Sequence, residues 1–560
     1  MLEMKIISSL EKCFLDSDPG EFAPVERIRI YRNSPGAFQF IAFDESEADD
    51  RRVRYRLVAE GDIAPCLRFR CVENVPNYIP VPPTSSRAAL SDNDYLRTTP
   101  GLYPDVLVPL LNKGLVMVLH QQLHAVWVDV ENDGSLLPGE YEIVLKLIDL
   151  KGDSVAAQAS VTVEVLDAWL PEQETIVTQW FHADCLADYY GVEVFSDRHF
   201  EICRYFVETA VRNGINMILV PVFTPPLDTA VGGERTTTQL VKITCRNGDY
   251  RFDFSLMDRW MDMCRECGVK YYEISHLFTQ WGAYHAPKIM AEVDGEYRQI
   301  FGWETDGAGE EYVAFLGRFL TELTAHLRDR GDTDNVYFHI SDEPHAEHLD
   351  QYRKNVENVK PYLHGFKQLD ALSHVEYYRE GLCDVPVPLS TRFREFADED
   401  IPERWVYYCC SPWVGASNRF LSMHSARTRF MGIQMYAHGV KGFLHWGYNF
   451  YNSWLSEDCV DPFLNSNGGY WVSGGDAASV YPGRNGIPLE SLRLIAFRQG
   501  LEDMRVLKLC EQYYPKKEIM ARLEEICGKI VFEKCVNDTQ TMTAVRDLLD
   551  DMIMAKLSDK

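Results

Sequence analysis

Positive charge is scarce in this 560-residue sequence, which has 56 Lys and Arg residues against 84 Asp and Glu residues and a formal net charge of −28. A surface of that sign repels phosphate backbones and anionic lipids, so we expect neither nucleic acid nor a membrane as a partner. The sequence also lacks a run of ~20 apolar residues, which a membrane-spanning helix requires. The stretch "MLEMKIISSLEK" has no basic region ahead of a long apolar core, so we predict no signal peptide and a cytoplasmic location.

Metal and cofactor motifs are scarce as well. The 15 cysteines are scattered, and the CxxC formed by Cys264 and Cys267 has no second pair to complete a zinc site. A Walker loop, a G-x-S-x-G turn and a G-x-G-x-x-G that opens a helix are all absent from the sequence. We therefore predict no cofactor and no metal, and we interpret the cysteines as reduced core residues. No pattern in the sequence indicates an oligomeric state.

The N-terminal region, residues 1–168, is rich in short strand-like segments. Apolar and polar residues alternate in segments such as "FQFIAFD" and "YEIVLKLID", and turn signals such as "NDG" and "KGD" occur between the later ones. Alternation of period two without helical runs is typical of a β-sandwich. We therefore predict an all-β, immunoglobulin-like domain over these residues.

Residues 169–487 instead combine helical and strand-like segments. Ser196 and Gly214 are expected to cap a helix that precedes the buried strand "INMILVPVF", and the same unit recurs before "VKYYEISHLF" and "NVYFHIS". About eight strands in such units predict a parallel (β/α)8 barrel, whose usual length is ~250 residues. Residues 488–560 are helical and are expected to pack on the barrel. The predicted fold is therefore multidomain: a β-sandwich, an α/β TIM barrel and a C-terminal helical region.

Aromatic rings and polar side chains gather where the predicted barrel strands end. In a TIM barrel this edge holds the active site. Sugars suit such an edge, because their C–H faces stack on rings and their hydroxyls pair with carboxylates and imidazoles. We therefore predict a carbohydrate as the partner. The residues that we expect to contact it are His182, His276, Tyr408, Trp446, Tyr448 and Asp476.

Two adjacent carboxylates, Asp342 and Glu343, follow the predicted fourth strand in "FHISDEPHAEH". Glycosidic bonds are usually hydrolysed by two carboxylates ~5–9.5 Å apart, a geometry that adjacent residues suit poorly. In substrate-assisted hydrolysis the nucleophile is the 2-acetamido oxygen of the substrate, so the protein supplies one orienting residue and one acid/base. On this interpretation Asp342 stays ionised and stabilises the oxazolinium ion. Glu343, with a raised pKa, protonates the leaving group and then activates water.

The same stretch is also compatible with a helix cap or with a metal site. Ser341, Asp342 or Glu343 can act as the N-cap of a helix whose first turn contains Pro344. A metal site is compatible with the residue types, although the histidine spacing is not that of an HExxH motif. The residues that would form such a site are His339, Asp342, His345, Glu347 and His348.

Two alternative functions also stay open. The chain can be a glycosidase that pairs Glu343 with a distant carboxylate, Asp370 or Glu376. It can also be a non-catalytic carbohydrate-binding protein on a degenerate barrel. The presence of both Asp342 and Glu343 argues mildly against the second alternative, because a binding module requires no acid.

Four segments, taken together, resemble a known family. The segment "FHISDEP" resembles the catalytic Asp–Glu segment of glycoside hydrolase family 123, the β-N-acetylgalactosaminidases. The segment "YPGRNGIPLESLRLIAFRQGLEDMRVL" resembles a signature of the related domain of unknown function 4091, and residues 95–110 and 124–145 resemble the N-terminal domain of that group. Ile495 and Gln499 depart from that signature, in which acidic residues are expected.

The resemblance spans nearly the whole chain and has implications for fold and function. It implies a β-sandwich, a (β/α)8 barrel and a C-terminal region. It implies an exo-acting, retaining, substrate-assisted hydrolase of terminal β-linked N-acetylgalactosamine or a related 2-acetamido sugar. By position in the motif, Asp342 corresponds to the residue that orients the acetamido group and Glu343 to the acid/base.

Overall fold

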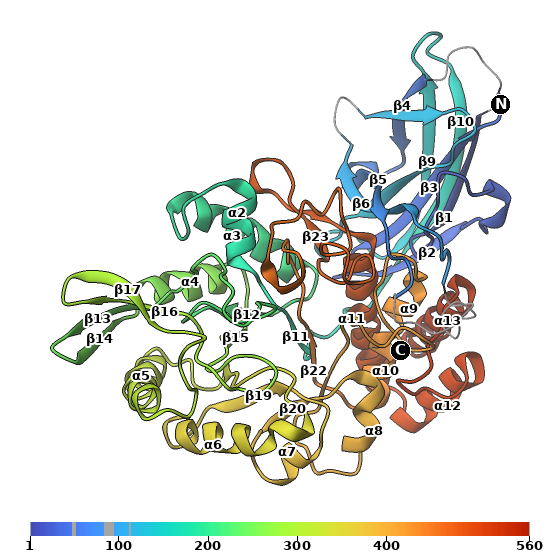
Figure 1. Cartoon of the computed structure of the whole chain (residues 1–560). Coiled ribbons are helices and arrows are strands. Elements are labelled where there is room, and N and C mark those ends of the chain that lie inside the picture. Colours follow the sequence, from blue (N-terminus) through green and yellow to red (C-terminus); the bar gives the residue numbers. More distant parts are fainter. Residues whose placement is uncertain (1, 47–51, 83–94, 111–113, 559–560) are drawn as a thin grey trace. The chain divides into compact units, whose positions relative to one another are not determined.

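The computed structural model describes residues 2–46, 52–82, 95–110 and 114–558 (Figure 1). The chain forms two compact units. Unit 1 consists of Met1–Gln173, Trp413–His438 and Leu489–Lys560, and unit 2 consists of Glu174–Pro412 and Gly439–Pro488. The domain boundaries expected after residues 168 and 487 stay predictions. Two later segments, Trp413–His438 and Leu489–Lys560, belong to the same unit as the N-terminal strands.

Unit 1 contains two five-stranded sheets. The first has the order β1 (Leu2–Ser8), β3 (Gly36–Asp44), β8 (His124–Val130), β5 (Leu67–Asn77) and β6 (Gly101–Pro109). The second has the order β2 (Arg27–Tyr31), β10 (Val155–Leu166), β9 (Gly139–Asp149), β4 (Arg52–Glu60) and β7 (Leu115–Leu119). In β9 the buried residues Ile143, Leu145 and Leu147 alternate with more exposed ones, so one face of the strand enters a core that both sheets share. This is the sandwich architecture that the alternation predicts.

Helices complete unit 1. They are α9 (Ser425–Arg429), α10 (Met431–Ala437), α11 (Leu492–Glu511), α12 (Lys516–Cys527) and α13 (Thr539–Ser558), and the short strand β24 (Leu489–Glu490) precedes α11. Helix α11 begins after Ser491, whose hydroxyl accepts the N–H of Leu494 at 3.1 Å. A buried ion pair at 2.8 Å between Arg493 and Asp105 joins this helix to β6.

Unit 2 is built on eight parallel strands (Figure 1). They are β11 (Ile176–Gln179), β12 (Met217–Val220), β15 (Tyr271–Ile274), β18 (Val336–Phe338), β19 (Lys367–Ala371), β20 (Val385–Val387), β21 (Trp405–Tyr407) and β22 (Gly442–His445). Each strand lies next to its neighbours in sequence, and β22 also pairs with β11. A parallel bridge between Leu389 and Tyr407 links the ends of this sheet. The result is the predicted barrel.

Helices connect the barrel strands. They are α2 (Ala183–Tyr190), α3 (Asp197–Arg212), α4 (Ser255–Glu266), α5 (Glu310–Asp329), α6 (Leu349–Val359), α7 (Glu376–Arg379) and α8 (Phe393–Phe396). Ser196 caps α3 as predicted, since its hydroxyl accepts the N–H of His199 at 3.3 Å. Gly214 follows that helix with a φ of 84°, a conformation that glycine adopts without steric cost. Within the described residues, no helix combines the length and apolar character needed to cross a membrane.

A four-stranded sheet in unit 2 was not predicted from the sequence. Its order is β14 (Asp249–Asp253), β13 (Lys242–Arg246), β16 (Ile289–Val293) and β17 (Glu296–Phe301). The two hairpins are insertions after β12 and β15. Their outer strands, β14 and β17, are largely exposed and carry little apolar alternation. The turns Asn247-Gly248 and Asp294-Gly295 both have positive φ angles, as hairpin turns of this composition require.

Candidate active site

Asp342 and Glu343 follow β18 at its carboxyl end, in a tight turn. Glu343 has a φ of 44°, in the left-handed region that residues with side chains rarely adopt. Its N–H donates to the carbonyl of Ala371 at 3.0 Å, and the carbonyl of Asp342 accepts the N–H of Trp281 at 2.9 Å. Because the left-handed turn ends the extended backbone, the two neighbouring side chains are not forced onto opposite faces.

This geometry corrects the hypothesis that the carboxylates cap a helix. The 3-10 turn Ala346–His348 has His345 as its N-cap, and α6 begins at Leu349. The backbone at Glu343 is left-handed and lies two residues before this N-cap. The two carboxylates therefore do not cap the helix, and the side chains that do so come later in the chain.

The carboxylate of Glu343 is bound by Tyr407, the last residue of β21. The Tyr407 hydroxyl donates to Glu343 Oε1 at 2.6 Å. Burial raises the pKa of Tyr407 well above its usual value, and the negative charge of Glu343 adds to the shift, so the hydroxyl stays a donor at neutral pH. The predicted Tyr408 is the next residue, and its buried ring packs on Phe443 and His445 with centroids 4.9 and 5.5 Å away.

Asp342 lies in a different environment from Glu343, whose carboxylate has a hydrogen-bond donor. It is half-buried, and among the described residues no donor forms a hydrogen bond with its carboxylate. Burial raises the pKa of Asp342 well above its usual value, and the adjacent charge of Glu343 raises it further. The direction of this shift runs against the sequence-based expectation that Asp342 stays ionised.

A buried charge network lies beside the pair. His339 Nδ1 donates to Asp370 Oδ1 at 3.0 Å, and His339 Nε2 donates to Glu273. Burial alone lowers the pKa of His339, but the charges and hydrogen bonds of the two carboxylates outweigh it and raise this pKa to about 10. Glu273, on β15, also accepts the indole N–H of Trp180 and the hydroxyl of Thr178, each at 2.8 Å. A positively charged imidazolium is thus fixed next to Asp342.

The two carboxylates considered as distant partners of Glu343 lie in unlike environments. Asp370 is fully buried and accepts hydrogen bonds from His339, the hydroxyl of Tyr352 and the backbone N–H groups of residues 340 and 341. Glu376 is exposed on α7. The carboxylate oxygens of Asp370 are therefore already occupied by donors from the protein itself.

His276 is stacked on His339, with ring centroids 4.3 Å apart. It is fully buried, and neither of its ring nitrogens has a hydrogen-bond partner in the part of the chain that the structure describes. Burial, together with the positive charge of His339, holds the pKa of His276 well below its usual value. His276 is therefore a neutral imidazole whose donor and acceptor are both unused.

Three of the predicted contact residues form one connected group. His182 Nε2 lies 2.8 Å from the carbonyl of Trp446, and the Trp446 indole donates to Asp476 Oδ2 at 3.1 Å. Asp476 Oδ1 is 3.2 Å from His445 Nε2, which carries the proton of a neutral ring because Nδ1 accepts the N–H of Gly447. Trp446 is half-buried, and Asp476 is fully buried.

Tyr448 does not join this group. Its buried hydroxyl donates to the carbonyl of Phe206 in α3 at 2.8 Å, and its ring stacks on Phe181.

Arg235 was not predicted from the sequence, and it makes a bidentate pair with Asp184 at 2.8 and 2.9 Å. Arg235 lies in an irregular loop between β12 and β13, where no periodic pattern marks it.

Arg235 also sets the state of His182. Its Nη2 lies 3.2 Å from His182 Nδ1, so both ring nitrogens of His182 face a protein partner. Burial and the positive charge of Arg235 lower the pKa of His182 to about 4.

Within the described ranges, no three His, Cys, Asp or Glu side chains are arranged to hold a metal ion.

Asp342 and Glu343 follow the carboxyl end of β18, and this end of a TIM barrel is where active sites lie. The sequence matches the family model described as the catalytic domain of glycoside hydrolase 123 over residues 180–510. This match covers more than half of the chain and includes Asp342 and Glu343. The chain belongs to glycoside hydrolase family 123, and its substrate is therefore a carbohydrate.

A solved structure shows the same fold. A family 123 glycoside hydrolase from Clostridium perfringens, described for glycolipid glycan hydrolysis, is 14% identical and aligns over 100% of this chain and 99% of its own, with a TM-score of 0.75. A family 2 member from Bacteroides cellulosilyticus is 14% identical over 82% of this chain and 48% of its own, with a TM-score of 0.28. A β-glucuronidase from Ruminococcus gnavus is 9% identical over 90% and 97%, with a TM-score of 0.30. No curated protein matches the chain.

Proposed function

We propose that this glycosidase is an exo-acting, retaining β-N-acetylhexosaminidase that cleaves terminal β-linked N-acetylgalactosamine, or a related 2-acetamido sugar, through an oxazolinium intermediate. The adjacency of Asp342 and Glu343 at the end of β18 carries this proposal. Two neighbouring carboxylates are poorly suited to flank a glycosidic bond as a separated nucleophile and acid do. They can serve a substrate that brings its own nucleophile.

Asp342 is the residue that orients the acetamido group. Its carboxylate has no hydrogen-bond donor from the described chain, and an acetamido N–H supplies one. A hydrogen bond to the ionised form favours that form, so binding of the substrate lowers the raised pKa of Asp342. The resulting negative charge then stabilises the positive oxazolinium ring as it forms.

Glu343 is the acid and base. In the first step the acetamido oxygen attacks the anomeric carbon, the bond to the leaving oxygen breaks, and protonated Glu343 gives its proton to that oxygen. In the second step Glu343 takes a proton from water, which attacks the anomeric carbon and opens the ring. Two inversions leave the anomeric configuration unchanged. Tyr407 fixes the orientation of Glu343 through its 2.6 Å hydrogen bond.

Two of the predicted contact residues, Trp446 and His276, have features that suit a sugar. The half-buried ring of Trp446, held by Asp476, offers a face for the sugar. His276 has an unused donor and an unused acceptor for hydroxyls. The alternative in which Glu343 acts with Asp370 has less support, because Asp370 already accepts four hydrogen bonds, from His339, Tyr352 and residues 340 and 341.

A panel of aryl glycosides tests the proposal. The β-N-acetylgalactosaminide, the β-N-acetylglucosaminide and the plain β-galactoside are assayed side by side with the wild type and with Asp342→Asn, Glu343→Gln and Glu376→Gln. We expect cleavage of a 2-acetamido sugar, strong loss in the first two variants and wild-type rates in Glu376→Gln, whose side chain is exposed on α7. Cleavage of the plain galactoside at a similar rate contradicts the mechanism. Binding of sugars without any cleavage favours the non-catalytic alternative.

A further inference from the structure

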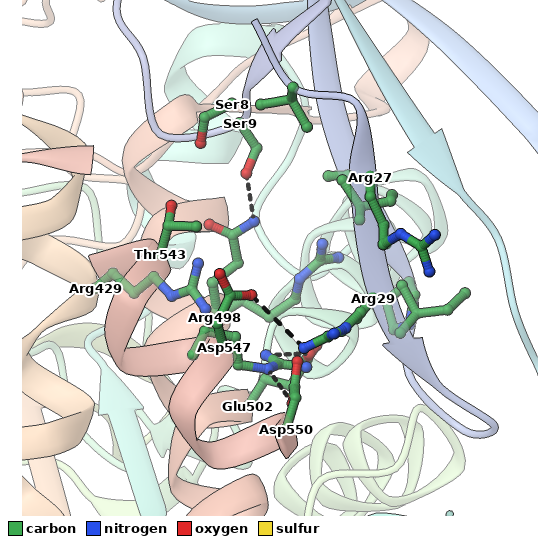
Figure 2. Close-up of a pocket in the computed structure, with 18 of the residues that line it drawn as sticks. Ser8, Ser9, Arg27, Arg29, Arg429, Arg498, Glu502, Thr543, Asp547 and Asp550 are labelled. Carbon is green, nitrogen blue, oxygen red and sulfur yellow. Dashed lines mark hydrogen bonds and ion pairs between the residues drawn. The ribbon is translucent and has the colours of Figure 1, made fainter. Parts of the chain in front are cut away.

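Two features of the molecule lie apart from the proposed mechanism. The first is a cavity of about 360 Å³ in unit 1, between strands β1, β2 and β3 and helices α9, α11 and α13 (Figure 2). Most arginines in its lining contact carboxylates, as Arg29 does with Asp551 at 2.7 Å, so these charges are compensated within the protein. The second is a pair of adjacent cysteines in unit 2, Cys409 and Cys410, which brings two thiols together.

Cys409 and Cys410 follow strand β21 at its carboxyl end, the end of the barrel strands at which Asp342 and Glu343 also lie. Both side chains are thiols in the structure, and their sulfur atoms are 3.8 Å apart. A disulfide bond holds its sulfur atoms ~2.05 Å apart. The two sulfurs are therefore close enough for a bond to form after a local movement of the turn that carries them.

The two thiols differ in exposure. Cys410 is exposed, whereas Cys409 is half-buried and packs against the barrel core cluster that contains Trp405 and Tyr407. The hydrogen bond with Cys410, together with burial, raises the pKa of Cys409 well above its usual value, so Cys409 keeps its proton. Cys410 is thus the thiol that meets a reagent from solution, and Cys409 is placed to react with Cys410 afterwards.

We propose that Cys409 and Cys410 are a redox-active pair, which a low-molecular-weight disulfide converts reversibly into a vicinal disulfide beside the candidate active site. The Cys410 thiolate attacks one sulfur of the reagent, whose S–S bond breaks and releases one thiolate, and a mixed disulfide forms. Cys409 then loses its proton and attacks the Cys410 sulfur, and the second thiolate leaves. The two cysteines lose two electrons and two protons, and the reagent is reduced to two thiols.

The adjacency of the two residues makes this disulfide easy to reduce. Consecutive Cα atoms lie ~3.8 Å apart across a trans peptide, whereas disulfides usually join Cα atoms ~4.4–6.8 Å apart. A bond between neighbours is therefore strained, and strained disulfides have more oxidising reduction potentials than structural ones. Such a bond suits a reversible modification better than a permanent cross-link.

Ring closure is expected to reach Glu343 through Tyr407. Cys409 lies two residues after Tyr407, whose hydroxyl donates to Glu343, and the Cys409 N–H donates to the carbonyl of Ser411 at 2.9 Å. The ring changes the backbone between Cys409 and Cys410 and therefore this turn. We expect kcat to fall about tenfold, the factor that loss of one hydrogen bond to a charged group supplies. This effect rests on the proposed function, whereas formation of the disulfide does not.

Peptide mapping of the full chain tests the pair. The native chain is incubated with glutathione disulfide, its remaining thiols are blocked with iodoacetamide, and it is cleaved with trypsin without a reductant. The tryptic peptide 405–419 contains Cys409 and Cys410 and no other cysteine. We expect this peptide to be two hydrogen atoms lighter than the reduced form, to carry no alkyl group, and to regain both thiols after dithiothreitol. The kcat for an aryl β-N-acetylgalactosaminide, measured on the same samples, should fall and recover in step.

The variant Cys410→Ser is expected to keep the wild-type rate in the reduced state and to lose its sensitivity to glutathione disulfide. The matched control Cys459→Ser, which removes another exposed cysteine of unit 2, should respond as the wild type does. A peptide that stays alkylated at both cysteines, or one that keeps a glutathione adduct, overturns the vicinal disulfide. An oxidised peptide with an unchanged kcat overturns the effect on Glu343. A reduced chain that cleaves no sugar contradicts the proposed function instead, and the mass of the peptide still decides the disulfide.

Discussion

The hydrogen bond from Tyr407 to Glu343 gives the sharpest quantitative prediction. The variant Tyr407→Phe removes the hydroxyl that lies 2.6 Å from Glu343 Oε1 and keeps the buried ring. A hydrogen bond to a charged group contributes ~1.5–3 kcal/mol, and ~1.4 kcal/mol corresponds to a factor of ten in rate. If Glu343 needs this bond to hold its orientation in the transition state, kcat falls by about ten- to hundredfold. KM changes little, because Tyr407 acts through Glu343.

The assay is steady-state hydrolysis of an aryl β-N-acetylgalactosaminide, with kcat and KM determined separately. The matched control is Tyr337→Phe, which removes another buried tyrosine hydroxyl of the same barrel, one that donates to Glu403 at 2.9 Å. We expect this control to lower stability without the loss in kcat. An equal fall in kcat for both variants, or a change confined to KM, refutes the positioning role of Tyr407.

Three further predictions concern charge. Because burial and Glu343 raise the pKa of Asp342, and the ionised form accepts the acetamido N–H more strongly and stabilises the oxazolinium ion, kcat/KM should fall as pH drops through a value well above 3.8. An acid limb centred near 3.8 contradicts this. The pKa of His339 is raised from 6.5 to about 10 in the folded state, so its contribution to stability is complete below pH 6.5 and is lost as pH rises through 10. Melting temperatures across this window should fall in the wild type and vary less in His339→Gln; parallel curves exclude this linkage. Glu273→Gln removes one partner of a buried imidazolium and should lower the free energy of unfolding by ~3–5 kcal/mol, whereas the exposed control Glu60→Gln should lower it by less than ~1 kcal/mol in denaturant titrations. Equal losses of unfolding free energy in Glu273→Gln and Glu60→Gln would refute the stabilising role of the buried network.

The fold was predictable where periodicity is strong. The helix after Ser196 has a cap, an apolar stripe and a terminal glycine, and the structure has all three. The two hairpins of the four-stranded sheet were missed because their strands are short and the outer two, β14 and β17, are largely exposed. Their turns, Asn247-Gly248 and Asp294-Gly295, are strong hairpin signals and would have revealed them.

The site was predictable only in part. A carboxylate pair that follows a buried strand is visible in the sequence, and the structure places Asp342 and Glu343 after the carboxyl end of β18. Their catalytic role stays a prediction. The left-handed turn at Glu343 cannot be read from residue types, so the helix cap stayed open until the structure excluded it. The sequence analysis selected Tyr408 and not Tyr407. Successive side chains of a strand point to opposite faces, so a choice that is off by one residue selects a side chain on the wrong face. Glu273 forms its network through contacts between distant segments, and no local pattern marks them.

The central claim is that the substrate supplies the nucleophile, and fluorination of its N-acyl group tests this most directly. Aryl 2-acetamido β-galactosides with zero, one, two and three fluorines on the acetyl carbon differ mainly in the nucleophilicity of the acyl oxygen. We predict that kcat falls steeply and steadily along this series in the wild type. Rates that stay constant along the series would show that a protein carboxylate attacks the anomeric carbon and would contradict the mechanism.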